Sequence, residues 1–251
     1  MTDGLPEKKK KAHLGRLSRW FFKRRVNRLY AENDYLDAYR LHTDMRAKRD
    51  PKTAIGGMWD EVGQLQIDFL RGEGLLEGHR MLDIGCGSLR GGRHFIRHLE
   101  PGGYTGFDMS EGVIEAGRRL LADEGLLDKR PRLIANTTGD FRFKMFGAET
   151  FDFLLAQSVF THLKREHLEE CFQNIGRLMG PGSRFYFTFY SGEASARSGP
   201  KSFQFPFSFF EKIAQENGFE LADRSEDYPH PRGQKMACVK RRPTPPELSS
   251  S

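Results

Sequence analysis

From residue 80 onward, short apolar segments alternate with helical ones, and this alternation constrains the fold more than any other feature. Strands are predicted at Met81–Ile84, Tyr104–Phe107, Pro131–Ala135 and Phe151–Ala156, with helical spacing after the first, second and fourth. The fourth is apolar except for Asp152, as expected for a parallel strand buried on both faces. The pattern predicts a doubly wound α/β fold with a mostly parallel sheet.

The carboxyl-terminal part continues the pattern and then changes direction. A fifth strand alternates aromatic and polar residues over 185–190, and two last strands, Phe219–Arg224 and Lys235–Lys240, form a hairpin-like end. A chain of 251 residues can bury one substantial core. In such sheets the ligand crevice lies at the carboxyl ends of the strands, where the strand order reverses.

The expected organisation has four parts. Residues 79–242 form the α/β domain, and residues 31–78 form a helical lid or extension before it. Residues 243–251 are a tail rich in Pro and Ser, and residues 1–30 are a basic, partly disordered tail.

The net charge of +6 comes from the amino-terminal tail. Residues 1–30 hold ten Lys and Arg and two acids, a charge of +8, so the remaining residues carry −2. Residues 13–30 have the spacing of a basic amphipathic helix. One interpretation has residues 8–30 binding an anionic membrane surface or nucleic acid. The other has the apolar side packing on the body or on a second chain.

A glycine-rich turn follows the first predicted strand. Gly85 and Gly87 allow a ligand to approach the main chain, and Asp108 lies 21 residues after Gly87, at the end of the second strand. The third glycine of a dinucleotide fingerprint is replaced by Arg90, which argues against a pyrophosphate ligand. These residues favour an adenosine-bearing ligand without a diphosphate.

The segment Asp83-Ile84-Gly85-Cys86-Gly87 resembles the first motif of the class I S-adenosylmethionine-dependent methyltransferases. The resemblance covers Met81 to Arg241 and implies a seven-stranded, Rossmann-like sheet whose last strand is antiparallel. Three further segments resemble a bacterial branch whose acceptors are poorly defined: 57–63, 88–92 and 157–163.

The resemblance assigns the cofactor, S-adenosyl-L-methionine, to particular positions. Asp83, Gly85, Cys86, Gly87 and Gln157 would surround its methionine part, Asp108 would accept the ribose hydroxyls, and Met109, Asp140 and Phe141 would contact the adenine. Arg90 would either pair with the cofactor carboxylate or cap a loop.

Candidate residues for the acceptor side follow the later strands. His162, Tyr190 and His230 are the candidate catalytic residues, with His162 first as a general base. Trp59 and Glu193 are candidates for the substrate pocket. The segments 190–201 and 228–234 are expected to form loops over its mouth.

The cysteines, Cys86, Cys171 and Cys238, are odd in number and form no CxxC motif, so neither a disulfide framework nor a metal site is predicted. The sequence has no apolar run long enough to span a membrane and no secretory signal, which favours a cytoplasmic protein, peripheral to the membrane if the basic tail binds there.

Three functions remain open from the sequence. The first is methyl transfer to a small-molecule, sugar or lipid-linked acceptor by in-line displacement. The second is RNA or DNA methylation with the basic tail on phosphates, against which stand the near-neutral body and the lack of a base-modification motif after the fourth strand. The third is a non-catalytic cofactor-binding module.

Overall fold

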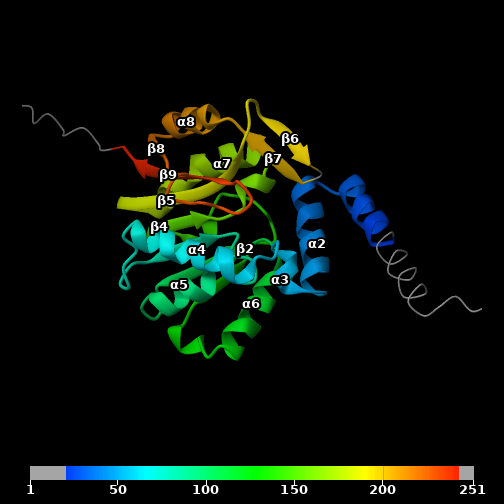
Figure 1. Cartoon of the computed structure of the whole chain (residues 1–251), viewed down its shortest axis with the longest axis horizontal. Helices are drawn as coiled ribbons and strands as arrows, with labels where there is room; N and C mark the ends of the chain where they lie inside the picture. The colour runs from blue at the N-terminus through cyan, green and yellow to red at the C-terminus, as the bar shows by residue number, and fades with distance from the viewer. Residues whose placement is uncertain (1–20, 200, 243–251) are drawn as a thin grey trace, which may run out of the picture.

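The computed structural model describes residues 21–199 and 201–242, and a twisted sheet flanked by helices organises them (Figure 1). The strands are β1 (Met81–Ile84), β2 (Tyr104–Asp108), β3 (Arg132–Ala135), β4 (Phe151–Ala156), β5 (Met179–Ser191), β6 (Ala196–Gly199), β7 (Ser202–Phe205), β8 (Phe219–Asp223) and β9 (Lys235–Arg241). The helices are one over residues 21–32, then α2 (Tyr35–Ala47), α3 (Pro51–Ala54), α4 (Trp59–Gly72), α5 (Gly92–His98), α6 (Glu111–Asp123), α7 (Arg165–Ile175) and α8 (Phe207–Glu216).

The strand pairing confirms the predicted fold class. β3, β2, β1, β4 and β5 lie side by side in that order and run parallel, so the order reverses between β1 and β4. β9 pairs with β5 antiparallel, and β8 then pairs with β9. The result is the mostly parallel, Rossmann-like sheet expected from the sequence, with the last strand reversed.

A hairpin formed by β6 and β7 was not predicted, because segment 190–201 was expected to be a loop throughout. β7 pairs with the carboxyl end of β5, Tyr190 facing Gln204, and β6 pairs with β7. Residues 191–201 are mostly small, polar or charged and lack the β-branched and aromatic residues that mark strands. The pairing uses Tyr190 and Ser191 at the end of β5, beyond the residues that pair with β4 and β9.

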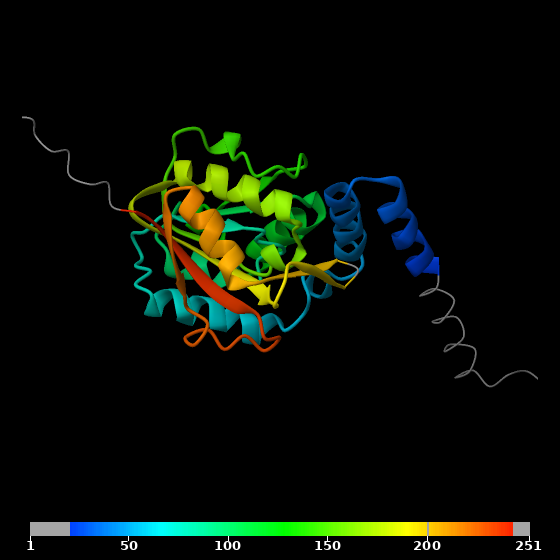
Figure 2. The same cartoon turned by 90° about the horizontal axis from the view of Figure 1, so that it is seen from above.

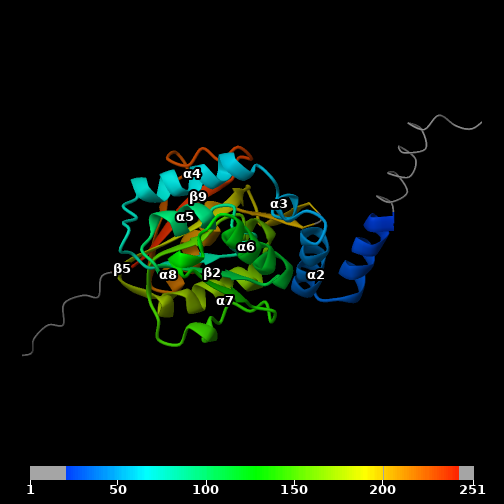
Figure 3. The same ribbon diagram turned by 90° about the horizontal axis from the view of Figure 1, so that it is seen from below.

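Helices cover both faces of the sheet and bury separate cores. α7 and α8 lie on one face, and α4, α5 and α6 lie on the other (Figures 2 and 3). Alternate residues of β4 divide between the cores: Leu154 packs with the first, and Phe153 and Leu155 pack with the second. The near-continuous apolar run of β4 follows from this two-sided burial.

The amino-terminal helices sit at the end of the sheet where the parallel strands terminate. The rings of Phe22 and Tyr30 lie 5.9 and 6.0 Å from the ring of His42 on α2, so the apolar side of helix 21–32 packs on the body. Residues 1–20 of the basic tail lie outside the described residues, and an anionic partner for residues 8–30 stays a prediction. None of the described helices has both the length and the apolar character needed to cross a bilayer.

Leu154 tests the importance of the central strand, because its side chain is fully buried between β1 and β5. We expect Leu154→Ala to lower the free energy of unfolding by about 2–5 kcal/mol, measured by urea denaturation. Leu127→Ala is the matched control, since Leu127 is 55% exposed and should change stability by no more than about 0.5 kcal/mol. Equal effects from the two substitutions would contradict the placement of β4.

Candidate active site

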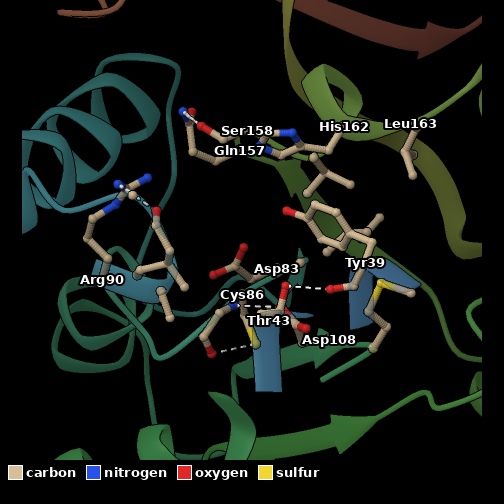
Figure 4. Close-up of a pocket in the computed structure, with 18 of the residues that line it drawn as sticks. Tyr39, Thr43, Asp83, Cys86, Arg90, Asp108, Gln157, Ser158, His162 and Leu163 are labelled. Carbon is tan, nitrogen blue, oxygen red and sulfur yellow. Dashed lines mark hydrogen bonds between the residues drawn. The ribbon is translucent and has the colours of Figure 1, made fainter. Parts of the chain in front are cut away.

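A cavity of about 530 Å³ opens at the carboxyl ends of β1, β2 and β4, beneath α2 and the turn over residues 53–58 (Figure 4). Its volume is within the range of about 300–1,000 Å³ that small-molecule pockets occupy. Every residue predicted to bind the cofactor lines it: Asp83, Gly85, Cys86, Gly87, Arg90, Asp108, Met109, Asp140, Phe141 and Gln157. The catalytic candidates His162, Tyr190 and His230 line it too.

The glycine turn has the conformation that its sequence predicts. Gly85 and Gly87 have φ angles of 70° and 56°, which residues with a side chain rarely adopt. A Cβ on Gly85 would collide with Val159, and one on Gly87 would lie 2.7 Å from Cγ2 of Ile55. Both the backbone angles and the close approach of neighbouring segments therefore require glycine here.

Two buried carboxylates face the cavity from β1 and β2. The backbone N–H groups of Gly87 and Ser110 donate to the carboxylate of Asp108 at 3.0 and 2.9 Å. The Tyr104 hydroxyl donates to Asp83 at 2.8 Å. Burial raises the pKa of Asp108 to about 6 and that of Asp83 to about 7, because desolvation disfavours the charged form. Both groups are poised to bind hydrogen-bond donors or positive charge.

Gln157 belongs to a polar network at the end of β4. Its amide oxygen accepts from the Tyr228 hydroxyl at 2.8 Å, and its amide nitrogen donates to Gln234 at 3.3 Å. The Ser158 and Thr188 hydroxyls also donate to Gln234, at 3.0 and 2.8 Å. The network fixes the side chains that form this wall of the cavity.

Arg90 holds the turn that covers the cavity. One terminal nitrogen of its guanidinium donates to the carbonyl of Gly57 at 2.9 Å and approaches that of Ile55 at 3.4 Å. Its Nε is buried and has no hydrogen-bond partner among the described residues. Arg90 therefore caps a loop, as one of the two sequence interpretations expected, and retains a buried donor.

The two cavity histidines carry their protons on different nitrogens. Nδ1 of His230 accepts the backbone N–H of Arg232 at 3.2 Å, so neutral His230 carries its proton on Nε2, which is buried without a partner in the described structure. Nδ1 of His162 lies against the carbonyl of Lys201 and must donate to it, which leaves Nε2 as an unprotonated acceptor. Burial, followed by nearby positive charges, lowers the pKa of His230 to about 4.

The same main cause, burial, lowers the pKa of His162 to about 4. The hydrogen bond to Lys201 opposes this shift, and the charges of Lys201 and Arg46 reinforce it. His162 is therefore a neutral imidazole at pH 7, with its ring 5.3 Å from that of Tyr39.

Asp140 and Phe141 are already engaged by neighbouring groups. The Asp140 carboxylate accepts the Thr138 hydroxyl at 2.8 Å and the Arg142 backbone N–H at 3.0 Å. The Phe141 backbone N–H donates to Glu170 at 3.0 Å. These contacts fix the segment after β3 where it borders the cavity, and they leave its role in adenine binding a prediction.

The structure does not bring Trp59 and Glu193 to the described cavity, in contrast to the sequence expectation. The Trp59 ring lies at the start of α4 between the cationic groups of Lys52 and Arg93, at 5.2 and 5.3 Å from its centroid. Glu193 is exposed in the turn between β5 and β6. Trp59 does lie in the predicted helical segment 31–78, at the start of α4, but other residues of that helix line the cavity instead.

Sequence reasoning did not single out several cavity residues: Tyr39, Thr43, Arg46, Ser158, Lys201 and Arg232. Lys201 and Arg232 do lie in the segments 190–201 and 228–234 that were expected over the mouth of the pocket. Most belong to α2 or to the turns near residues 201 and 232, and no motif marks them. Ser158 carried one signal, its position directly after an apolar strand, where its φ of 58° redirects the chain.

Comparisons with known proteins agree with this geometry. Residues 82–185 match a family described as a methyltransferase domain. Magnesium protoporphyrin IX methyltransferase (ChlM) from Synechocystis PCC 6803, solved with bound SAH, is 16% identical with a TM-score of 0.63, over 83% of this chain and 100% of that one. An O-methyltransferase family protein from Burkholderia thailandensis is 12% identical with a TM-score of 0.64, over 90% and 70%. A TehB-like SAM-dependent methyltransferase from Corynebacterium glutamicum is 20% identical with a TM-score of 0.57, over 80% and 99%.

At these identities the solved structures establish the shared fold alone. Together, the matched domain, the strand order and the glycine turn define a methyltransferase domain with a Rossmann-like sheet. Residues 82–185 are therefore a methyltransferase domain, and the sheet around them has the fold of S-adenosylmethionine-dependent methyltransferases.

Asp83 should make the stability of the ligand-free protein depend on pH. Its pKa is raised to about 7 in the folded state, so its stabilising contribution is present below the ordinary value near 3.8 and is lost as the pH rises through 7. We expect Asp83→Asn to reduce the decline in unfolding free energy between about pH 4 and pH 7, measured by urea denaturation across that range.

Asp123→Asn is the control for this measurement, because Asp123 is exposed at the end of α6. An Asp83→Asn variant whose stability declines with pH as steeply as that of the wild type would show that Asp83 is not buried as described.

Proposed function

We propose that this protein binds S-adenosylmethionine in the cavity at the carboxyl ends of β1, β2 and β4 and methylates a small-molecule acceptor on an oxygen or nitrogen atom. The observation that carries the proposal is the convergence of the glycine turn and the Asp108 carboxylate, joined by the Gly87 hydrogen bond at 3.0 Å. A bend that exposes backbone next to a buried carboxylate fits a ligand with a ribose diol.

The cavity residues fit the ribose of this cofactor, its positively charged methionine end and its carboxylate. Asp108 would accept the ribose hydroxyls, and Asp83 would lie near the positively charged methionine end. The buried, unpartnered donors of Arg90 and His230 suit the methionine carboxylate, since an unpaired buried donor is costly until an acceptor satisfies it. We therefore assign His230 to cofactor binding, because its Nδ1 already accepts a hydrogen bond and its Nε2 is a donor.

When bound, S-adenosylmethionine supplies a methyl group already activated on sulfur. The protein then has to align the acceptor, exclude water and remove a proton. Nε2 of His162 is the described acceptor best suited to take that proton, because the Lys201 carbonyl fixes the tautomer. Tyr190 also lines the cavity, from the end of β5.

A small-molecule acceptor fits the enclosure of the site. Tyr39 and Thr43 from α2 and the turn at 53–58 cover the cavity. A magnesium protoporphyrin IX methyltransferase (ChlM) and an O-methyltransferase family protein from Burkholderia share this fold. A nucleic-acid duplex could reach the cavity only by displacing α2. Asp44 holds α2 to the start of α6 through hydrogen bonds from Ser110 and Gly112.

Asp108 provides the direct test of cofactor binding. We expect Asp108→Ala to weaken binding of S-adenosylhomocysteine by about 1.5–3 kcal/mol through lost charge-assisted hydrogen bonds, measured by calorimetry. Asp128→Ala, at an exposed site in the turn after α6, should bind as the wild type does. For the wild type, the ligand at 100 times its dissociation constant should add about 2.7 kcal/mol of stability. The absence of any stabilisation would refute the proposed site.

His162 tests the proton-transfer step separately. We expect His162→Gln to reduce kcat by about 10²–10⁴-fold while the affinity for S-adenosylhomocysteine is unchanged, because the side chain acts on the acceptor. The assay follows transfer of radiolabelled methyl groups to a small-molecule extract. His98→Gln, on α5 outside the cavity lining, is the matched control. A His162→Gln enzyme with full turnover would eliminate His162 as the base.

A further inference from the structure

The acceptor half of the cavity carries positive charge that no described acid neutralises. Arg46, Lys201 and Arg232 line the cavity, and none of them forms an ion pair with a carboxylate among residues 21–199 and 201–242. The described acids of the lining are Asp83, Asp108 and Asp140, and all three lie on the cofactor side.

Lys201 is the cation nearest the proposed base. It lies between β6 and β7, and its ammonium group sits 5.6 Å from the centroid of the Tyr39 ring. Its backbone carbonyl accepts a hydrogen bond from Nδ1–H of His162. Burial, followed by the charge of Arg46, lowers the pKa of Lys201 to about 8, as expected for a cation without a counter-ion.

Arg46 and Arg232 are held at the cavity by the covering turn. Arg46 donates to the carbonyl of Thr53, and Arg232 donates to that of Gly56. Each contact uses one of the five N–H donors that a guanidinium offers, so both side chains retain donors for a ligand. Arg46 is partly buried and Arg232 is exposed, so Arg46 is the one that gains more when an anion binds beside it.

The positive charge also acts on His162. The charges of Lys201 and Arg46 contribute to its low pKa, which makes it a poor base in the empty site. An anion bound to these two side chains would offset that effect and raise the basicity of Nε2. An anionic acceptor would thus raise the basicity of His162, and His162 is the residue that removes the proton from this acceptor.

We propose that the acceptor carries a carboxylate or phosphate group, which Lys201 and Arg46 bind while the atom to be methylated faces His162. This inference rests on the proposed methyltransferase function and specifies the acceptor class for the same site.

The cofactor's own carboxylate is the competing occupant of these cations. Figure 4 shows Arg90 on one side of Asp83 and Asp108, and Tyr39 and His162 on the other. Arg90 and His230 hold the unpartnered donors suited to the methionine carboxylate. Lys201 contacts Tyr39, so it belongs to the opposite side.

The test uses the full chain saturated with S-adenosylhomocysteine, titrated separately with acetate, inorganic phosphate and the neutral acetamide. Binding is followed by the NMR signal of the His162 ring proton, identified by its loss in His162→Gln. We expect acetate or phosphate to bind and to raise the pKa of His162, and acetamide to do neither. The two anions distinguish a carboxylate acceptor from a phosphorylated one.

Lys201→Gln should weaken binding of the preferred anion about tenfold, as expected for one charge-assisted hydrogen bond, and leave the affinity for S-adenosylhomocysteine unchanged. Lys212→Gln makes the same charge change on α8, where the Lys212 side chain is 71% exposed, and should alter neither affinity.

Three outcomes would overturn the inference. They are binding of neither anion, equal binding of acetate and acetamide, and a Lys201→Gln variant that loses S-adenosylhomocysteine instead of the anion. If wild-type protein fails to bind S-adenosylhomocysteine at all, the proposed function itself is wrong, so the two failures are distinguishable.

Discussion

The hydrogen bond from the Gly87 backbone N–H to the Asp108 carboxylate connects the two parts of the chain that make the site. It requires β1 and β2 to be adjacent and parallel, with Ile84 beside Phe107, so that the turn after one strand meets the last residue of the other. It also requires the left-handed backbone of Gly87. The sheet register therefore sets the geometry of the cavity, and the helices on either face maintain that register through their packing.

Charge is divided across this cavity. Asp83 and Asp108 lie between Arg90 and the side of Tyr39 and His162 and form no ion pair with the described residues, and their raised pKa values reflect burial. Arg46 and Lys201 also line the cavity, and neither forms an ion pair with a carboxylate within the described ranges. Desolvated charges that are not paired with opposite charges are unfavourable for the empty protein, and they favour ligands that bring the complementary charges.

The amino-terminal segment completes the site that the sheet begins. The Tyr35 hydroxyl donates to the carbonyl of His162 at 2.9 Å, so α2 contacts the segment that carries the proposed base. Asp44 accepts the Gly112 backbone N–H at 3.0 Å and also receives the Ser110 hydroxyl, which fixes α2 to the start of α6. A segment outside the α/β alternation thus contributes both a cover over the cofactor side and a wall for the acceptor.

The sequence by itself determined the sheet, because apolar strands, glycine turns and an acid at a strand end are local patterns. Each of them predicts the conformation of the backbone at its own position. Asp83, Gly85, Gly87 and Asp108 could be assigned to one crevice for this reason. Only the tertiary structure decided that Trp59 does not line the cavity and that Lys201 does. Those outcomes depend on how α4 packs and how the β6–β7 hairpin pairs with β5, and both are long-range contacts that no local pattern encodes.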